Sequence, residues 1–302
     1  MIDLCTLGTG GSMPMPDRAL SSLYVRVNGR LMLVDCGEGT QTGIRKAGWG
    51  FVSLDAILLT HYHGDHCGGL PGILLSIAKT PRTEPVHIYG PAGLRQVVSG
   101  LCVVCPGLPF PVILHELRGG ETFEAIGLTV TSFPLHHGVP CLGYRFELPR
   151  AGAFDPDKAR ALRVPLPLWK LLQRGETVEV AGRGIEPSQV MGQPRKGLSF
   201  LFATDTRPVP AIIEQGRGVD MMFLEGMYGS EEKRPQALKN RHMLFEEAAD
   251  LARQADAKAL TLTHFSTSLD EPEAFLPLAQ AIFPKTVCAT DGLCVTLRYE
   301  GR

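Results

Sequence analysis

The chain has 302 residues and a mass of 32.8 kDa, enough for one large α/β domain or two average ones. Hydrophobic residues make up 44% and charged residues 20%, which excludes a disordered chain, and we find no apolar run near the ~18 residues of a membrane span. Lysine plus arginine number 30 against 31 acids, so the net charge of −1 excludes a uniformly basic protein but not a local basic patch.

The N-terminus and the cysteines favour a cytoplasmic protein. The opening stretch MIDLCTLGTGG is typical of a buried strand and lacks the basic and apolar regions of a signal peptide. Eight cysteines are scattered through a large chain, so we expect no disulfide framework and a reducing compartment.

Short aliphatic runs alternate with helical periodicity along the chain. We predict strands at 2–7, 23–27, 31–35, 56–60, 86–89, 200–204, 221–224, 260–263 and 294–299. We predict helices at 38–46, 70–78, 92–101, 245–254 and 272–283. Leu128, Val130 and Ser132 alternate with threonines, as in a half-exposed antiparallel strand. This order predicts an α/β chain with stacked sheets flanked by helices.

The segment 150–196 differs from the rest of the chain. It is rich in proline, arginine and glycine, with helical patterns only at 156–162 and 168–173. Nine basic residues against five acids give it a charge of +4, so the remainder carries −5. The asymmetry predicts an inserted arm that binds a polyanion; the alternative is a solvated loop whose charge has no function.

The sequence THYHGDH at 60–66 predicts a metal site. Three histidines and an aspartate follow a predicted strand within six residues, where one turn brings them to a common centre. Imidazole and carboxylate ligands suit Zn²⁺, with Mn²⁺ or Fe²⁺ as alternatives. Asp55 just upstream either orients a ligand histidine or merely begins the strand.

Further ligand-type side chains stand where other apolar runs end. They are His136 or His137, Asp205 and His264. Together with the first cluster they favour a seven-ligand site for two metal ions.

The chain resembles the ribonuclease Z (tRNA 3′-processing endonuclease) branch of the metallo-β-lactamase fold. The resemblance covers nearly the whole chain and rests on THYHGDH, the upstream DCGEGTQ, the spacing of His137 from Gly143-Tyr144, and the late Asp205 and His264. It implies a single αββα-sandwich domain over 1–302, with two stacked mixed sheets and an inserted arm at 150–196.

The resemblance also assigns roles to the site residues. It implies that His61, His63 and His137 hold one zinc, that Asp65, His66 and His264 hold a second, and that Asp205 bridges them. A bridging hydroxide would attack the phosphodiester, Asp65 would accept its proton, and His242, oriented by Glu225, would protonate the leaving oxygen. The expected reaction removes 3′ trailers from pre-tRNA and leaves a 3′-hydroxyl.

The arm of the family grips tRNA, and family members act as homodimers. The resemblance therefore implies that the protein forms a homodimer and has no membrane partner. It also implies RNA-binding roles for Arg160, Arg163, Lys170 and Arg174.

Several family positions are altered here: Leu224, Met243, Leu244 and Ser268 replace polar or charged residues, and Arg18-Ala19 replaces an arginine–asparagine pair. Two alternatives therefore stand beside pre-tRNA processing: a di-zinc phosphodiesterase for small substrates such as cyclic nucleotides, or a metal-bound RNA-binding protein with little turnover.

Overall fold

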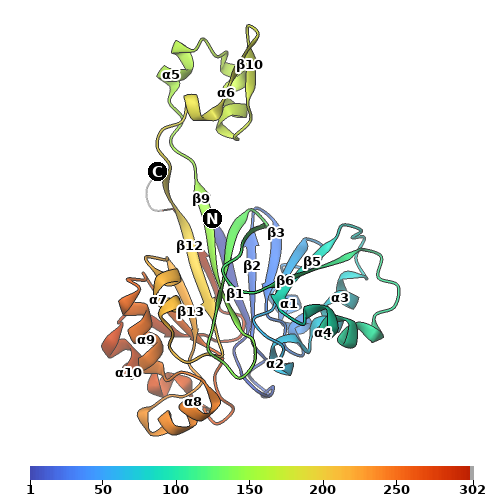
Figure 1. Cartoon of the computed structure of the whole chain (residues 1–302), viewed down its shortest axis with the longest axis vertical. Helices are drawn as coiled ribbons and strands as arrows, with labels where there is room; N and C mark the ends of the chain where they lie inside the picture. Colours follow the sequence, from blue (N-terminus) through green and yellow to red (C-terminus); the bar gives the residue numbers. More distant parts are fainter. Residues whose placement is uncertain (300–302) are drawn as a thin grey trace. The chain divides into compact units, whose positions relative to one another are not determined.

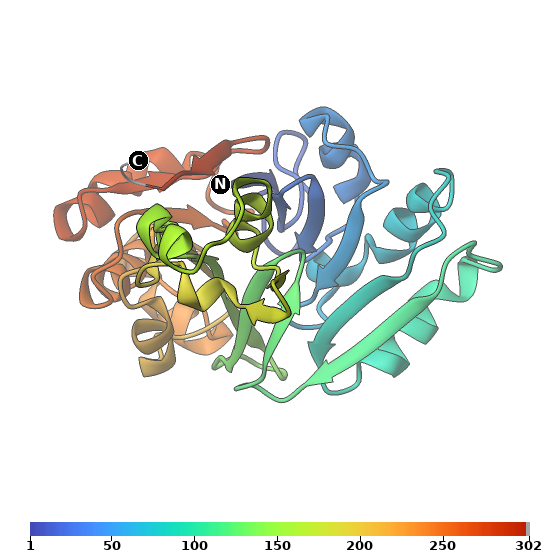
Figure 2. The same ribbon diagram turned by 90° about the horizontal axis from the view of Figure 1, so that it is seen from above.

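A computed structural model describes residues 1–299, which divide into two compact units. The main body comprises Met1–Glu147 and the residues from Leu198 onward, and the insert unit is Leu148–Gly197. In the main body two sheets stack face to face, with helices on their outer sides (Figures 1 and 2). The two stacked mixed sheets and flanking helices confirm the predicted αββα arrangement.

The first sheet has the strand order β16-β1-β2-β3-β4-β5-β6. Its strands are β1 Ile2–Gly8, β2 Ser22–Val27, β3 Arg30–Val34, β4 Leu54–Leu58, β5 Val86–Pro91, β6 Val112–Leu117 and β16 Cys294–Leu297. Strands β3 to β6 run parallel to one another. Parallel strands end at the same edge of a sheet, so the chain leaves β3 and β4 side by side.

The second sheet has the order β15-β14-β13-β12-β9-β8-β7. Its strands are β7 Thr122–Ala125, β8 Leu128–Pro134, β9 Leu142–Arg150, β12 Arg195–Ala203, β13 Met221–Glu225, β14 Leu260–Thr263 and β15 Thr286–Cys288. Strands β12 to β15 are parallel, so the carboxyl ends of β12, β13 and β14 also share one edge.

Helices cover the outer face of each sheet. Against the first sheet lie α1 Thr40–Ala47, α3 Leu70–Ile77 and α4 Leu94–Leu101, and against the second α7 Pro210–Gly216, α9 Phe245–Gln254 and α10 Leu276–Ile282. The shorter elements are α2 Gly64–Cys67, α8 Arg234–Asn240, η1 Cys102–Val104, η3 Glu231–Lys233 and η4 Pro272–Phe275. Helix α9 shows why they pack: Phe245, Ala248, Ala249 and Ala252 recur at three and four residues and are fully buried.

Strand alternation builds three apolar layers. In β3, Leu31 and Leu33 join the cluster beneath α1 and α3, while Met32 and Val34 point the other way and are also fully buried. Such strands need cover on both faces, which the second sheet supplies on the inner side.

The insert unit has a small core of its own. It contains α5 Pro156–Ala161, α6 Leu166–Gln173, the hairpin β10 Val178–Val180 and β11 Arg183–Ile185, and η2 Pro187–Gln189. The buried residues of this core are Ala159, Val164, Leu172, Val178, Ile185 and Val190. The predicted helices at 156–162 and 168–173 agree with α5 and α6, whereas the hairpin was not predicted.

One pair of cysteines departs from the expectation of unpaired thiols. Cys5 and Cys294 face each other across β1 and β16 and form a disulfide. The two residues are 289 positions apart, so only the strand register brings them together. The six other cysteines are free.

Among residues 1–299, the structure contains no helix with the length and apolarity needed to cross a bilayer.

A hydrogen bond between the two sheets is open to direct test. Tyr144 Oη on β9 donates to the carbonyl of Leu59 at 2.7 Å, just before the THYHGDH loop, and both residues are fully buried. Replacing Tyr144 with phenylalanine leaves this carbonyl without that donor and should lower the free energy of unfolding by about 1–3 kcal/mol. Urea denaturation measures the change; Tyr89→Phe is the control, and equal stabilities of wild type and Tyr144→Phe would contradict the prediction.

Candidate metal centre and active site

The THYHGDH loop begins directly after β4. Its first histidine, His61, is fully buried, and His63 precedes α2. The single turn of α2 then presents Asp65 and His66 to the same side. A backbone hydrogen bond stabilises this turn: the His66 N–H donates to the carbonyl of His63 at 3.0 Å.

A first cluster gathers four side chains from both sheets. His61 Nε2 lies 3.0 Å from His63 Nδ1, and His137 Nε2 lies 3.4 Å from that same atom. Asp205 Oδ1 is 3.8 Å from His61 Nε2 and 3.9 Å from His137 Nε2. These four groups present one ligand atom each within 4.8 Å of one another.

A second cluster adjoins the first through Asp205. His66 Nε2 lies 3.5 Å from Asp65 Oδ2 and 3.1 Å from Asp205 Oδ2, and His264 Nε2 lies 3.2 Å from Asp205 Oδ2. The two oxygens of Asp205 therefore face different clusters. All seven predicted ligand positions come together at this place.

The donor set fits a divalent cation. Among the described residues, His66 Nε2, Asp205 Oδ2 and His264 Nε2 are buried with no hydrogen-bond partner, although the two nitrogens lie only 3.1 and 3.2 Å from Oδ2. Buried polar atoms are nearly always hydrogen-bonded, so three that converge without hydrogen-bond geometry indicate ligand atoms aimed at a common centre.

The electrostatics point the same way. Burial would lower the pKa of His66, but Asp205 and Asp35 outweigh it and raise that pKa well above its usual range. Burial would raise the pKa of Asp205, but His264 and His66 hold it well below its usual range. The buried carboxylates thus require positive charge beside them, which either a proton on His66 or a cation supplies.

Three residues of the site share an unusual backbone conformation. Asp35, Asp205 and His264 have φ of 57°, 57° and 56°, in the left-handed region that residues with a Cβ rarely adopt. Asp35 and His264 follow β3 and β14 directly, and Asp205 comes two residues after β12. The left-handed turn redirects each side chain as its strand ends, and such conformations are concentrated at functional sites.

Asp35 is the orienting carboxylate that the sequence interpretation did not identify. Its Oδ2 lies 2.8 Å from His66 Nδ1, and its Oδ1 accepts the Thr60 N–H at 2.8 Å. Of the two alternatives for Asp55, the orienting role is wrong: the residue lies at the start of β4, as the other alternative held, and pairs with Arg30 and Arg82. Because β3 and β4 are parallel neighbours, Asp35 after β3 lies beside the THYHGDH loop after β4. Knowledge of this strand pairing would have identified Asp35.

The first glycine-rich turn closes the site from the other side. Ser12 N–H donates to Asp65 Oδ2 at 2.6 Å, and Gly11 N–H donates to the carbonyl of Phe265 at 2.9 Å. A Cβ on Gly11 would stand 2.7 Å from His264 Nε2, so only glycine permits this approach.

Half-buried His242 and buried Glu225 form a pair beside the first cluster. His242 Nδ1 lies 3.0 Å from Glu225 Oε2 and 3.9 Å from Asp205 Oδ1. The fully buried Glu225 also accepts the N–H groups of Thr206 and Met243 at 2.6 and 3.1 Å. Burial alone would lower the pKa of His242, but Glu225 and Asp205 raise it to about 9. The two carboxylates thus favour the protonated form of this imidazole.

An ion-pair network holds the segment that carries His242. Arg207 donates to the carbonyl of His242 at 2.5 Å and binds both oxygens of Glu247 at 2.5 and 2.8 Å. Glu247 also forms an ion pair with Arg234 at 2.8 Å. It caps α9 by accepting a hydrogen bond from the Leu244 N–H at 3.0 Å.

Other predicted positions lie apart from the clusters. The His136 side chain is exposed, and its N–H donates to Thr206 Oγ1. Leu224, Met243 and Leu244 are fully buried, the first two in the apolar cluster that includes α9, and Ser268 is exposed. The four basic residues proposed for RNA are all exposed in the insert unit: Arg160, Arg163, Lys170 and Arg174.

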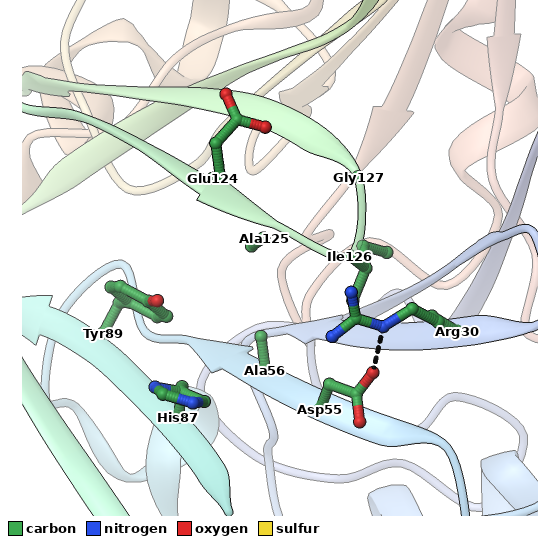
Figure 3. A pocket seen from close by; sticks show the side chains of 9 residues that line it. All are labelled: Arg30, Asp55, Ala56, His87, Tyr89, Glu124, Ala125, Ile126 and Gly127. Carbon is green, nitrogen blue, oxygen red and sulfur yellow. Dashed lines mark hydrogen bonds and ion pairs between the residues drawn. The ribbon is translucent and has the colours of Figure 1, made fainter. Parts of the chain in front are cut away.

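The clusters open onto a cavity of about 330 Å³. It is lined by His63, Asp65, His137, Asp205, His242 and His264, with Ser12, Met227, Tyr228, Asn240 and Ser266. A larger cavity of about 370 Å³ lies between β4 and β5 and the turn after β7 (Figure 3). One of its two carboxylates, Asp55, has both oxygens paired with arginines, and the other, Glu124, accepts a hydrogen bond from Thr129 Oγ1 at 2.6 Å.

The Glu247 network predicts a pH-dependent stability. Hydrogen bonds from Arg207 and the Leu244 N–H outweigh burial and lower the Glu247 pKa. A group with a lowered folded-state pKa stabilises the fold above its unfolded pKa, about 4.3, and loses this effect as the pH falls through the folded value. Glu247→Gln should therefore cost about 1–3 kcal/mol at pH 7 and progressively less in acid.

Unfolding free energies in urea from pH 7 down to about pH 3 measure this difference. Glu246→Gln, the adjacent residue of α9, is the matched control. A cost for Glu247→Gln that stays constant across this range would show that the ion pairs do not act as described.

Comparisons with known proteins identify the family and the fold. A family model described as anti-Pycsar protein Apyc1 matches residues 2–99. A ribonuclease Z from Lachnoclostridium phytofermentans is 46% identical over 301 residues, which cover 99% of each chain. The short form of human tRNase Z superposes with a TM-score of 0.71 at 23% identity over 98% of this chain and 100% of the other.

The metallo-β-lactamase fold protein YhfI from Bacillus subtilis also superposes with a TM-score of 0.71, at 18% identity over 97% and 98% of the two chains. These likenesses establish the fold, and the identity to the curated relative establishes the family. The chain has the metallo-β-lactamase fold and belongs to the ribonuclease Z family of metal-dependent endoribonucleases.

Proposed function

We propose that this protein is a zinc-dependent endoribonuclease that removes the 3′ trailer from precursor tRNA and leaves a 3′-hydroxyl. The observation that carries the proposal is the arrangement of two ligand clusters around Asp205, with the His242–Glu225 pair beside them. The names of the relatives, ribonuclease Z and tRNase Z, supply the substrate class.

The two clusters would hold two ions. His61, His63 and His137 would bind one, Asp65, His66 and His264 the other, with one oxygen of Asp205 turned to each. Nitrogen-rich sets with carboxylates favour Zn²⁺, with Mn²⁺ or Fe²⁺ as alternatives. When bound, the ions would make water a nucleophile near neutral pH and neutralise charge on the attacked phosphate.

Two side chains of this chain would move the protons. Water attacks phosphorus and the bond from phosphorus to the 3′ oxygen breaks; the proton of the water goes to Asp65. His242, whose protonated form Glu225 stabilises, donates its proton to the departing 3′ oxygen, and Glu225 holds the imidazole in place. Leu224 does not interrupt this pair, since Glu225 reaches His242 directly.

The insert unit would bind the body of the tRNA. Arg160, Arg163, Lys170 and Arg174 are exposed cations in a segment of charge +4, which suits the phosphate backbone. The homodimer implied by the family resemblance is part of the same proposal.

The test combines metal content with two assays, one on an unprocessed tRNA and one on a chromogenic phosphodiester. Wild type should carry two zinc ions per chain and cleave both substrates. Asp205→Ala should lose metal and all hydrolysis, because both clusters share this residue. Cleavage of the small ester alone would favour the small-substrate phosphodiesterase, and a zinc-bound protein inert on both would favour the binding protein.

His242→Asn separates metal binding from proton transfer. This variant should keep its zinc content, because the proposed ligands are unchanged, while kcat on tRNA falls about 10²–10⁴-fold. Zinc analysis and steady-state kinetics measure the two effects; His136→Asn is the matched control. A wild-type kcat would remove His242 from the mechanism.

The role of the insert unit is tested by neutralising its cations. Replacing Arg160, Arg163, Lys170 and Arg174 with glutamine keeps the small core of the unit. It should raise KM for tRNA and flatten its dependence on salt, while hydrolysis of the small ester continues. Equal loss on both substrates would show that these residues do not act through RNA.

A further inference from the structure

A second, smaller cavity adjoins the catalytic one. Its volume is about 190 Å³, and it lies among the loop after β13, η3 and the loop between β14 and η4. We call it the side pocket; it is lined by Met227, Tyr228, Gly229, Ser230, Glu232, Lys233, Ser268, Leu269, Asp270 and Phe275.

The two cavities have one wall in common. Met227 and Tyr228 line both, so the side pocket begins where the catalytic cavity ends. The Tyr228 ring stands edge-on to His242, with 6.3 Å between ring centroids, and its hydroxyl accepts a hydrogen bond from Asn240 at 2.8 Å. The Tyr228 ring therefore separates a group in the side pocket from the proposed proton donor.

The inner surface of the side pocket is apolar and aromatic, and its rim is polar. Met227 and Leu269 are buried, and half-buried Phe275 packs so closely that a Cβ on Gly229 would stand 2.4 Å from its ring. Lys233 and Asp270 are exposed at the rim. An apolar slot with donors and acceptors at its mouth suits a flat ring that carries polar groups on its edge.

The loops around the side pocket are fixed. Arg18 donates to the carbonyls of Leu269 and Asp270 at 3.0 and 3.1 Å, and the Tyr228 carbonyl accepts the Phe245 N–H at 3.1 Å. The cavity is thus largely formed before any ligand arrives, which limits the ordering that binding would require.

We propose that the side pocket binds an unpaired nucleobase of the RNA, that of the nucleotide whose 3′ oxygen leaves. The proposal rests on the endoribonuclease function proposed above. With the scissile phosphate at the clusters and its leaving oxygen at His242, the nucleotide that retains this oxygen lies on the side of Tyr228. Unpaired bases are held by packing on aromatic and apolar side chains and by hydrogen bonds to their edges.

The experiment is a double-mutant cycle that combines a substitution in the protein with the removal of one base from the RNA. Two precursor RNAs lack one base each, at the nucleotide 5′ or 3′ of the cleaved bond. For wild type, removing the 5′ base should lower kcat/KM about five- to a hundredfold, the range expected for one stacked base, and removing the 3′ base should have little effect. Phe275→Ala should cleave the intact RNA more slowly by a similar factor and lose little more when the 5′ base is absent.

A second variant fills the side pocket rather than enlarging it. Ser268→Trp, at an exposed rim position, should also abolish the difference between the intact and the 5′-abasic RNA. Phe123→Ala, a half-buried phenylalanine on β7, and Ser99→Trp, an exposed serine on α4, are the matched controls and should keep the full difference. Circular dichroism and zinc content confirm that each variant is folded and loaded.

The outcomes are distinct. If both pocket variants keep the full penalty for the missing 5′ base, or if the 3′ base carries the penalty instead, the side pocket does not have this role. If wild type cleaves no RNA, the endoribonuclease function itself fails, and the base-binding role falls with it. The proposal is supported if kcat/KM falls when the 5′ base is removed from the RNA cleaved by wild type, and if neither pocket variant shows a further fall of that size.

Discussion

The site depends on a single carboxylate that faces two ways. Asp205 turns Oδ1 to His61 and His137 and Oδ2 to His66 and His264. Two of these four partners, His61 and His66, lie in the THYHGDH loop after β4 of the first sheet. The other two follow strands of the second sheet, as Asp205 itself does. Neither sheet can assemble a cluster alone, so the site exists only once the two sheets have docked around this buried charge.

The two residues after Asp205 extend its influence to the proton donor. The Thr206 N–H donates to Glu225, which contacts His242, and the Arg207 guanidinium donates to the His242 carbonyl. One tripeptide therefore connects the ligand clusters, the carboxylate of the relay and the backbone of the histidine. A displacement of Asp205 would reach His242 through two separate hydrogen bonds, which physically couples the two parts of the proposed mechanism.

Local features could be predicted well from the sequence, whereas the pairing of strands could not. Strand ends followed by histidine or aspartate located all seven clustered residues, and α9 was predicted to the residue because its alanines and Phe245 repeat at helical spacing. Asp35 was not assigned as the orienting group, nor was the Cys5–Cys294 pair foreseen, because each depends on which strands are neighbours. The weakly amphipathic β6 and the short hairpin β10–β11 have no strong period of their own.

The left-handed backbone at Asp35, Asp205 and His264 has a consequence for how cations are captured. These conformations carry an intrinsic cost of about 1–3 kcal/mol each, which the surrounding sheets overcome when the chain folds. The side chains are then already turned inward before an ion arrives, so little conformational entropy remains to be lost at capture. The free energy needed to shape the coordination sphere is thus supplied when the chain folds and not when an ion binds, which favours tight ion binding.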